Sequence, residues 1–184
     1  MLDVLREQIG EIPIIAEDLG VITPDVVQLK DEFNLPGMKV LQFAFTENEP
    51  AGNRDIPFHH TRNCVAYTGT HDNNTTMGWF RTEASAGDKK TLARYQGKKP
   101  TQASICWDMI RLCYASVADA AVVPAQHFLQ LDEAARMNTP STTERNWLWR
   151  LSSGQLTDKL AREIRSMVEL FGRTGRTTIQ YDTY

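Results

Sequence analysis

Two acidic clusters are the residues of this chain best suited to catalysis. Glu17 and Asp18 follow a short apolar run, and His71 and Asp72 follow another apolar run much further along the chain. Converging carboxylates can break and remake a glycosidic bond: in a retaining enzyme one is the nucleophile and the other the acid/base, roughly 5 to 5.5 Å apart. An acidic pair after a strand can equally cap the next helix, so the residue types alone leave both interpretations open.

Strands and helices alternate around these clusters. Apolar runs predict parallel strands, and apolar residues at helical spacing predict helices. The expected strands are 12–16, 38–45, 64–67 and 120–125, and the expected helices are 2–9, 24–33, 101–116 and 157–171. Polar residues gather just past the carboxyl end of each strand, which is where a (β/α)8 barrel builds its active site.

The expected fold is therefore α/β, the C-terminal half of a (β/α)8 TIM barrel with parallel strands and a terminal helix. This half-barrel would span residues 1–172, and residues 173–184 would form an irregular tail. Four strands make only half a barrel, so an open α/β sheet is the alternative. The free strand edges of a half-barrel expose backbone donors and acceptors, which invites pairing with a partner.

The composition excludes several classes of function. The chain has 184 residues, a net charge of −3 and interleaved acids and bases, which argues against binding to nucleic acid or to a membrane. The three cysteines, Cys64, Cys106 and Cys113, have neither metal-ligand nor disulfide spacing and are expected to be buried thiols. With no signal peptide or membrane span in the sequence, we expect a cytoplasmic protein.

Five segments have the order and spacing of a known family's signature. They are IIAEDLGVITP at 14–24, LPGMKVLQFAF at 35–45, YTGTHDNNT at 67–75, RMNTP at 136–140 and NWLWR at 146–150. These segments resemble the amylomaltases, which are 4-alpha-glucanotransferases of the alpha-amylase clan. The resemblance implies a retaining transferase that moves alpha-1,4-glucan segments between maltooligosaccharides, with glucose as an acceptor and without a metal or organic cofactor.

The resemblance also implies roles for individual residues. Glu17 would be the acid/base, which protonates the leaving glycosidic oxygen and then deprotonates the acceptor hydroxyl. Asp72 would stabilise the transition state by gripping hydroxyls of the sugar at the cleavage point. The remaining pocket residues expected from the resemblance bind substrate; they are His71, Asp18, Phe43 and Asn138.

The sequence departs from the family pattern at three places. The family's nucleophile is an aspartate in an Arg-x-Asp-His context, and no such run precedes Glu17. We therefore expect this chain to be a fragment, inactive alone, whose partner is the missing N-terminal half of the barrel. His127 stands where the family commonly has an acid, and Ser141 stands where it commonly has glycine.

Two other functions stay open on the sequence alone. A hydrolase of the same clan would transfer the glucosyl unit to water, and a non-catalytic remnant would bind glucan without reacting. Among the tryptophans, Trp147 is the best candidate for stacking on a sugar ring. His59 and His60 could suggest a metal site, but they lack a defined ligand geometry.

Overall fold

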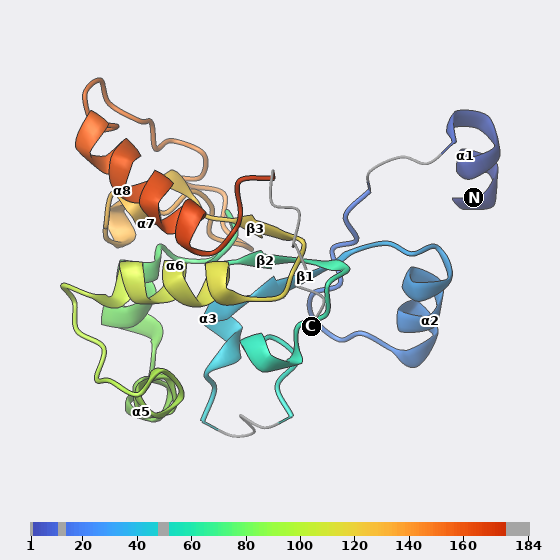
Figure 1. Cartoon of the computed structure of the whole chain (residues 1–184), viewed down its shortest axis with the longest axis horizontal. Coiled ribbons are helices and arrows are strands. Elements are labelled where there is room, and N and C mark those ends of the chain that lie inside the picture. Colours follow the sequence, from blue (N-terminus) through green and yellow to red (C-terminus); the bar gives the residue numbers. More distant parts are fainter. Residues whose placement is uncertain (1, 11–13, 48–51, 176–184) are drawn as a thin grey trace, which may run out of the picture.

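The computed structural model describes residues 2–10, 14–47 and 52–175. At its centre lies a parallel sheet of three strands in the order β1 (Gly37–Val40), β2 (Cys64–Tyr67) and β3 (Ala120–Val122), as Figure 1 shows. β2 is the central strand, and Cys64, Val65 and Ala66 are buried in it. A strand buried on both faces is typical of a parallel sheet that helices cover.

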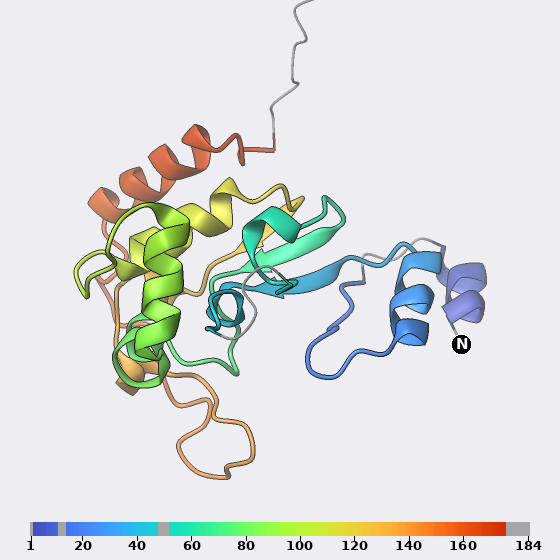
Figure 2. The ribbon, with the colours of Figure 1, turned by 90° about the horizontal axis from the view of Figure 1, so that it is seen from below.

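Helices and single helical turns connect and surround the strands. The α-helices are α1 (Leu2–Ile9), α2 (Pro24–Glu32), α3 (Leu41–Ala44), α4 (Thr76–Gly78), α5 (Ala86–Gln96), α6 (Ile105–Ala115), α7 (Ala125–Phe128) and α8 (Asp158–Leu170). Two 3-10 turns, Pro57–His59 and Glu133–Ala135, and one π-helical turn, Trp79–Glu83, complete the helical elements. Figures 1 and 2 both show α1 and α2 set apart from the sheet, beyond β1.

The hydrophobic core lies between the sheet and α6. Ile105, Met109 and Cys113 of α6 are fully buried, as are Phe45 after α3 and Leu92 of α5. The prediction of buried cysteine thiols is confirmed, since all three are free and buried. Burial raises the pKa of Cys106 and of Cys113 to about 12, so both stay protonated and unreactive.

The outer edge of β1 is covered by carboxylates from two loops. The Met38 N–H donates to Asp18 Oδ1 (2.7 Å), and the Val40 N–H donates to Asp55 Oδ1 (2.8 Å). A free strand edge normally presents a row of unpaired backbone groups. These two side chains satisfy that row, so the segments before α2 and after α3 are held against the sheet.

The expected strands need correction. For 12–16, residues 12–13 lie outside the described residues and 14–16 form no strand, although the Ala16 N–H donates to the Pro36 carbonyl (2.9 Å). Strand 38–45 ends at Val40, because Leu41–Ala44 turn into α3. Strand 120–125 ends at Val122, and α7 begins at Ala125. The 64–67 strand is confirmed as predicted.

The expected helices agree with the structure, but α4, α5 and α7 were not expected. Helices 2–9, 24–33, 101–116 and 157–171 correspond to α1, α2, α6 and α8, each within a few residues. A capping box between Ser85 and Asp88 begins α5, and Gly97 ends it at a φ of 75°. No residue of α8 is buried, so its apolar stripe is only partly covered.

The α/β class with a parallel sheet is thus confirmed, and the barrel half stays a prediction.

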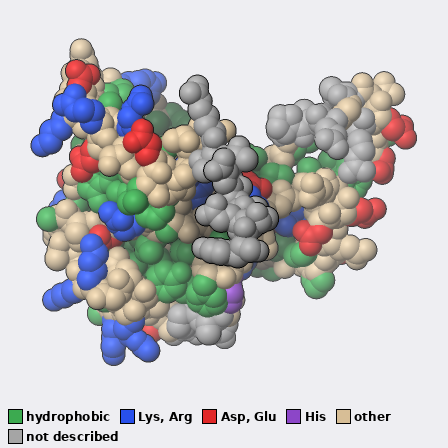
Figure 3. Space-filling view, in the orientation of Figure 1, with side chains coloured by type: hydrophobic (Ala, Val, Ile, Leu, Met, Phe, Trp, Pro, Cys, Tyr) green, Lys and Arg blue, Asp and Glu red, His purple; other side chains and the backbone are tan. Residues whose placement is uncertain are grey.

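On the face seen in Figure 3, basic side chains lie over α5 and α8, and acidic side chains lie over α2. Within the described ranges, no helix has the length and apolarity needed to cross a membrane.

Candidate active site

One cavity of about 250 Å³ brings the two acidic clusters together at the carboxyl ends of the strands. Its lining includes Glu17 from the first cluster, His71 and Asp72 from the second, and Tyr67 and Val122 from the ends of β2 and β3; the other lining residues are Leu19, Met38, Gly69, Thr70 and Pro124. Parallel strands end at the same edge of a sheet, which places the residues that follow β2 and β3 at one cavity. Glu17 reaches it from a segment whose described residues form no strand but which is held near β1 by the Ala16 N–H bond to the Pro36 carbonyl. The two predicted catalytic carboxylates therefore face a common space.

Glu17 is an exposed residue of this cavity lining. Its charge reaches Tyr67 at the end of β2. Burial raises the pKa of the Tyr67 hydroxyl, and the neighbouring negative charge of Glu17 raises it further. Tyr67 consequently stays a neutral hydrogen-bonding group beside the carboxylate.

Asp18, the next residue, has a different environment. It is only 6% exposed, and both carboxylate oxygens are engaged: Oδ1 accepts the Met38 N–H, and Oδ2 pairs with Arg54 (2.8 Å). Gly37 makes room for it, since a Cβ there would lie 2.4 Å from Asp18 Oδ2. These contacts make Asp18 an anchor for β1, and its predicted contact with sugar hydroxyls stays a prediction that this geometry does not favour.

The loop after β2 holds Asp72 at the cavity. Asn73 Oδ1 accepts from the Thr70 N–H (2.8 Å) and from the Thr70 hydroxyl (2.9 Å), and the Asp72 N–H donates to Thr70 Oγ1 (3.2 Å). These short-range bonds fix a tight turn. As a result the Asp72 side chain projects from a rigid loop while keeping 42% of its surface exposed.

His71, Asp72 and Asn138 converge, although Asn138 comes from a distant loop. Asn138 Nδ2 donates to Asp72 Oδ1 (2.5 Å), and His71 Nε2 lies 3.5 Å from the same oxygen. The Asn138 N–H also donates to the His71 carbonyl (3.0 Å). Three of the predicted site residues thus form one polar cluster. Phe43, in contrast, is half-exposed on α3 and lines neither this cavity nor the neighbouring one.

A second cavity of about 190 Å³ adjoins the first across His71. Trp147 lines it, packs against the His71 ring with 5.1 Å between centroids, and is 52% exposed. Its backbone φ of 62° is in the left-handed region, which is uncommon for a bulky residue, and its N–H donates to the Met137 carbonyl (2.7 Å). The exposed indole face suits the stacking role expected of Trp147.

His127 lies at the base of the second cavity. The ring is 2% exposed, and Nδ1 contacts the Thr68 hydroxyl (2.6 Å) and the Thr76 hydroxyl (3.1 Å). Burial lowers the pKa of His127 to about 3, so the imidazole is neutral at physiological pH. A neutral ring fits here because the two hydroxyls bring no charge to balance an imidazolium.

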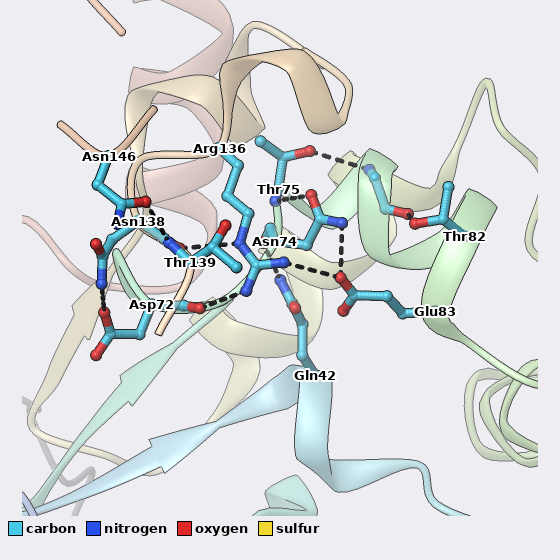
Figure 4. A network of polar contacts seen from close by, with 11 residues as sticks. Gln42, Asp72, Asn74, Thr75, Thr82, Glu83, Arg136, Asn138, Thr139 and Asn146 are labelled. Atoms are coloured by element: carbon cyan, nitrogen blue, oxygen red, sulfur yellow. Dashed lines mark hydrogen bonds and ion pairs between the residues drawn. The ribbon is translucent and has the colours of Figure 1, made fainter. Parts of the chain in front are cut away.

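Sequence reasoning missed a polar network behind the cluster (Figure 4). It joins Arg136 to Asp72, Asn138 and Glu83, and continues from Glu83 to Asn74. Arg136 is the first residue of the signature segment at 136–140, and this membership is the one signal in the sequence that points to it. Glu83 had no such signal.

The described ranges contain no group of three or more His, Cys, Asp or Glu side chains that could hold a metal ion. His60 is buried with both ring nitrogens engaged, Nδ1 with Ser116 Oγ (2.6 Å) and Nε2 with the Asp55 carbonyl (2.9 Å). Those contacts give His60 a structural role.

Comparison with known proteins decides the family. The family described as 4-alpha-glucanotransferase matches residues 1–157. The chain belongs to this family. It is 48% identical over 171 residues to a 4-alpha-glucanotransferase of Synechocystis, covering 92% of this chain and 33% of that protein. It is 44% identical over 171 residues to the 4-alpha-glucanotransferase of Thermus thermophilus, covering 90% of this chain and 34% of that protein.

A solved structure agrees with the sequence comparison. The amylomaltase of Streptococcus agalactiae in complex with acarbose superposes with a TM-score of 0.86 at 32% identity, covering 93% of this chain and 34% of that one. The resemblance to amylomaltases is thereby confirmed. This chain spans about a third of the length of these 4-alpha-glucanotransferases.

One departure from the family pattern has a visible consequence in the backbone. Ser141, where the resemblance led us to expect glycine, has a φ of 64°. That is the left-handed region, which glycine enters freely and which costs other residues free energy. Ser141 therefore carries a side chain in a backbone conformation that suits glycine.

Proposed function

We propose that this chain supplies the acid/base and the transition-state stabiliser of a 4-alpha-glucanotransferase that acts on alpha-1,4-glucans. The observation that carries the proposal is the shared cavity, which Glu17 of the first acidic cluster and Asp72 of the second both line. Membership of the 4-alpha-glucanotransferase family supports it. So does the acarbose complex of a related amylomaltase.

Two carboxylates at one cavity can divide the work of a retaining transfer. Glu17, an exposed residue of the cavity lining, gives its proton to the leaving glycosidic oxygen and takes one back from the acceptor hydroxyl. Asp72, with Oδ1 held by Asn138, presents its remaining oxygen toward sugar hydroxyls and the developing positive charge. The Tyr67 hydroxyl and Trp147 ring add a hydrogen-bonding group and an apolar surface.

The covalent step requires a third carboxylate, the nucleophile. We propose that it belongs to the upstream part of the longer relatives, and that the three-stranded sheet is a section of a (β/α)8 barrel which that part completes. On this account the chain alone forms no glycosyl-enzyme and moves no glucan.

A maltotriose disproportionation assay tests the proposal. The samples are this chain alone and this chain joined to the upstream part of the Synechocystis relative, each also as Glu17→Gln and Asp72→Asn. Glu32→Gln, an exposed carboxylate on α2, is the matched control. We expect the joined protein to release glucose and form longer maltooligosaccharides, and we expect Glu17→Gln and Asp72→Asn, but not Glu32→Gln, to abolish this activity.

Each other result has a definite meaning. Activity of this chain alone would place the nucleophile within it and refute the proposed division. Release of glucose without longer products would identify a hydrolase. An active joined protein that tolerates Glu17→Gln would remove Glu17 from the acid/base role.

A further inference from the structure

Arg136 donates hydrogen bonds to the backbone carbonyls of Asp72 and Asn138, two residues whose side chains also bond each other. Its Nη2 donates to the Asp72 carbonyl (2.8 Å), and its Nε donates to the Asn138 carbonyl (2.9 Å). Asn138 in turn donates its side-chain amide to Asp72 Oδ1. One guanidinium therefore sets the distance between two loops that are 66 positions apart in sequence. Figure 4 shows these groups facing one another.

Glu83, and not the Asp72 carboxylate, balances the positive charge of Arg136. Arg136 Nη1 donates to Glu83 Oε1 (3.1 Å), and the side chain of Arg136 is 23% exposed. Glu83 sits at the end of the π-helical turn and also accepts from Asn74 Nδ2 (2.8 Å). Asp72 is thus oriented through its backbone, because Arg136 binds its carbonyl and not its carboxylate.

The network is anchored in the fold at its other end. Asn74 is buried, its side-chain oxygen accepts the Thr75 N–H (2.9 Å), and its carbonyl accepts from Gln42 Nε2 (2.8 Å). Gln42 belongs to α3, directly after β1. The contacts therefore run without interruption from the sheet to Arg136 and on to the Asp72 loop.

We propose that Arg136 is a positioning residue, which holds the Asp72 carboxylate and its Asn138 partner in the geometry that the transition state requires. The inference rests on the proposed function of Asp72. A planar guanidinium reaches three acceptors in fixed directions, whereas the single nitrogen of lysine does not. Displacement of a catalytic group by about 1 Å can lower a rate roughly a hundredfold.

A spectroscopic test uses the 184-residue chain itself. In the 15N-labelled chain, the Asn138 side-chain amide protons report their bond to Asp72, and Asp72→Asn identifies the signal of that bond. We expect Arg136→Lys to shift the Asn138 signal toward its position in Asp72→Asn. Arg81→Lys is the matched control, because Arg81 pairs with Asp132 and Glu133 at the surface and does not contact the Asp72 loop.

A second variant separates the backbone contacts from the ion pair. Glu83→Gln removes the negative charge but leaves the two carbonyls that Arg136 binds, so the Asn138 signal should stay as in the unmodified chain. An unchanged Asn138 signal in Arg136→Lys would overturn the inference, and so would its loss in Glu83→Gln. If Arg136→Lys does not fold, loss of the Asn138 signal in Glu83→Gln would still overturn the inference.

A kinetic test uses the joined protein described above. We expect Arg136→Lys to lower kcat about tenfold to a hundredfold while KM changes by less than about twofold. A loss confined to KM, or a kcat equal to that of Arg81→Lys, would overturn the inference. Because Asp72→Asn is measured beside it, activity that survives Asp72→Asn would instead count against the proposed function, and the amide signal would still test positioning.

Discussion

At the scale of single residues, His127 shows how a side chain in an unexpected place can be stable. The resemblance led us to expect an acid at this position, yet here the ring lies buried between two threonine hydroxyls. Burial lowers its pKa from 6.5 to about 3, so the folded chain excludes a proton that the unfolded chain binds. The unfolded state therefore binds more protons between about pH 3 and pH 6.5, and stability must rise with pH across that window.

This reasoning gives a prediction about pH. Between pH 4.5 and pH 6, His127 should contribute a slope of up to about 1.4 kcal/mol per pH unit to the free energy of unfolding, and little above pH 7. Urea denaturation at several pH values measures the slope, and His127→Gln should remove this contribution. Buried His60, whose pKa is also lowered, remains in both proteins and serves as the internal reference. Equal slopes in the two proteins would contradict the account.

Ser141 gives a prediction about backbone strain. Because its φ is 64°, Ser141→Gly should raise the free energy of unfolding by about 1 kcal/mol. Ser153→Gly, at an exposed position outside the left-handed region, should lower it or leave it unchanged. Thermal and urea denaturation of both variants measure the difference. A destabilised Ser141→Gly would mean that the side chain contributes more than the strain costs.

At the scale of elements, the short helix α4 makes room for the polar network because its residue Gly78 has no side chain. Alanine normally stabilises a helix by about 1 kcal/mol relative to glycine. A Cβ on Gly78, however, would lie 2.2 Å from Asn74 Oδ1, and Asn74 is held by Glu83 and Gln42. We expect Gly78→Ala to destabilise the chain by about 1–3 kcal/mol in urea denaturation.

Gly52→Ala is the control for that prediction, because no atom lies within 4 Å of a Cβ built there. It should be neutral or slightly stabilising. If Gly78→Ala were equally harmless, Asn74 could move without cost, and the network would be less rigid than its contacts indicate.

The elements also show which parts of the fold a sequence can predict. The β2 strand was predicted correctly because its apolar run ends where the polar loop of Asp72 begins. The run after β1 was misassigned, since a short buried apolar segment looks the same as strand or helix, and Leu41–Ala44 are buried as a helical turn. α5 was missed because Leu92 is its only buried residue, which leaves almost no apolar periodicity.

The candidate site also has features that the sequence predicts and features that it does not. The meeting of Glu17 and Asp72 at one cavity was expected from strands before both residues. Only β2 before Asp72 is present, and Glu17 reaches the cavity from a segment whose described residues form no strand. The role of Arg136 could not be expected, because it binds backbone carbonyls, and every residue type carries a carbonyl. The anchoring contacts of Asp18 also depend on Arg54, whose position no local pattern predicts.

At the scale of the whole molecule, α8 is attached more by hydrogen bonds than by burial. None of its residues is buried, yet Arg173, just beyond it, binds three carbonyls where α6 leads into β3. Arg173 Nε donates to the Tyr114 carbonyl (2.8 Å), Nη1 to that of Ala118 (3.0 Å) and Nη2 to that of Ser116 (2.5 Å). Arg173 begins the predicted irregular tail, and its side chain bonds the segment after α8 to the connection between α6 and β3.

Arg173→Lys should therefore release α8 while keeping the charge. One lysine nitrogen does not replace a fork that spans three carbonyls, and each carbonyl left unpaired costs about 1–3 kcal/mol where water is excluded. We expect amide hydrogen exchange in α8 to accelerate at least about tenfold, with β2 unaffected. Arg165→Lys, exposed on α8 itself, should leave exchange unchanged. Unaltered exchange in Arg173→Lys would show that the half-buried apolar stripe alone holds α8 in place.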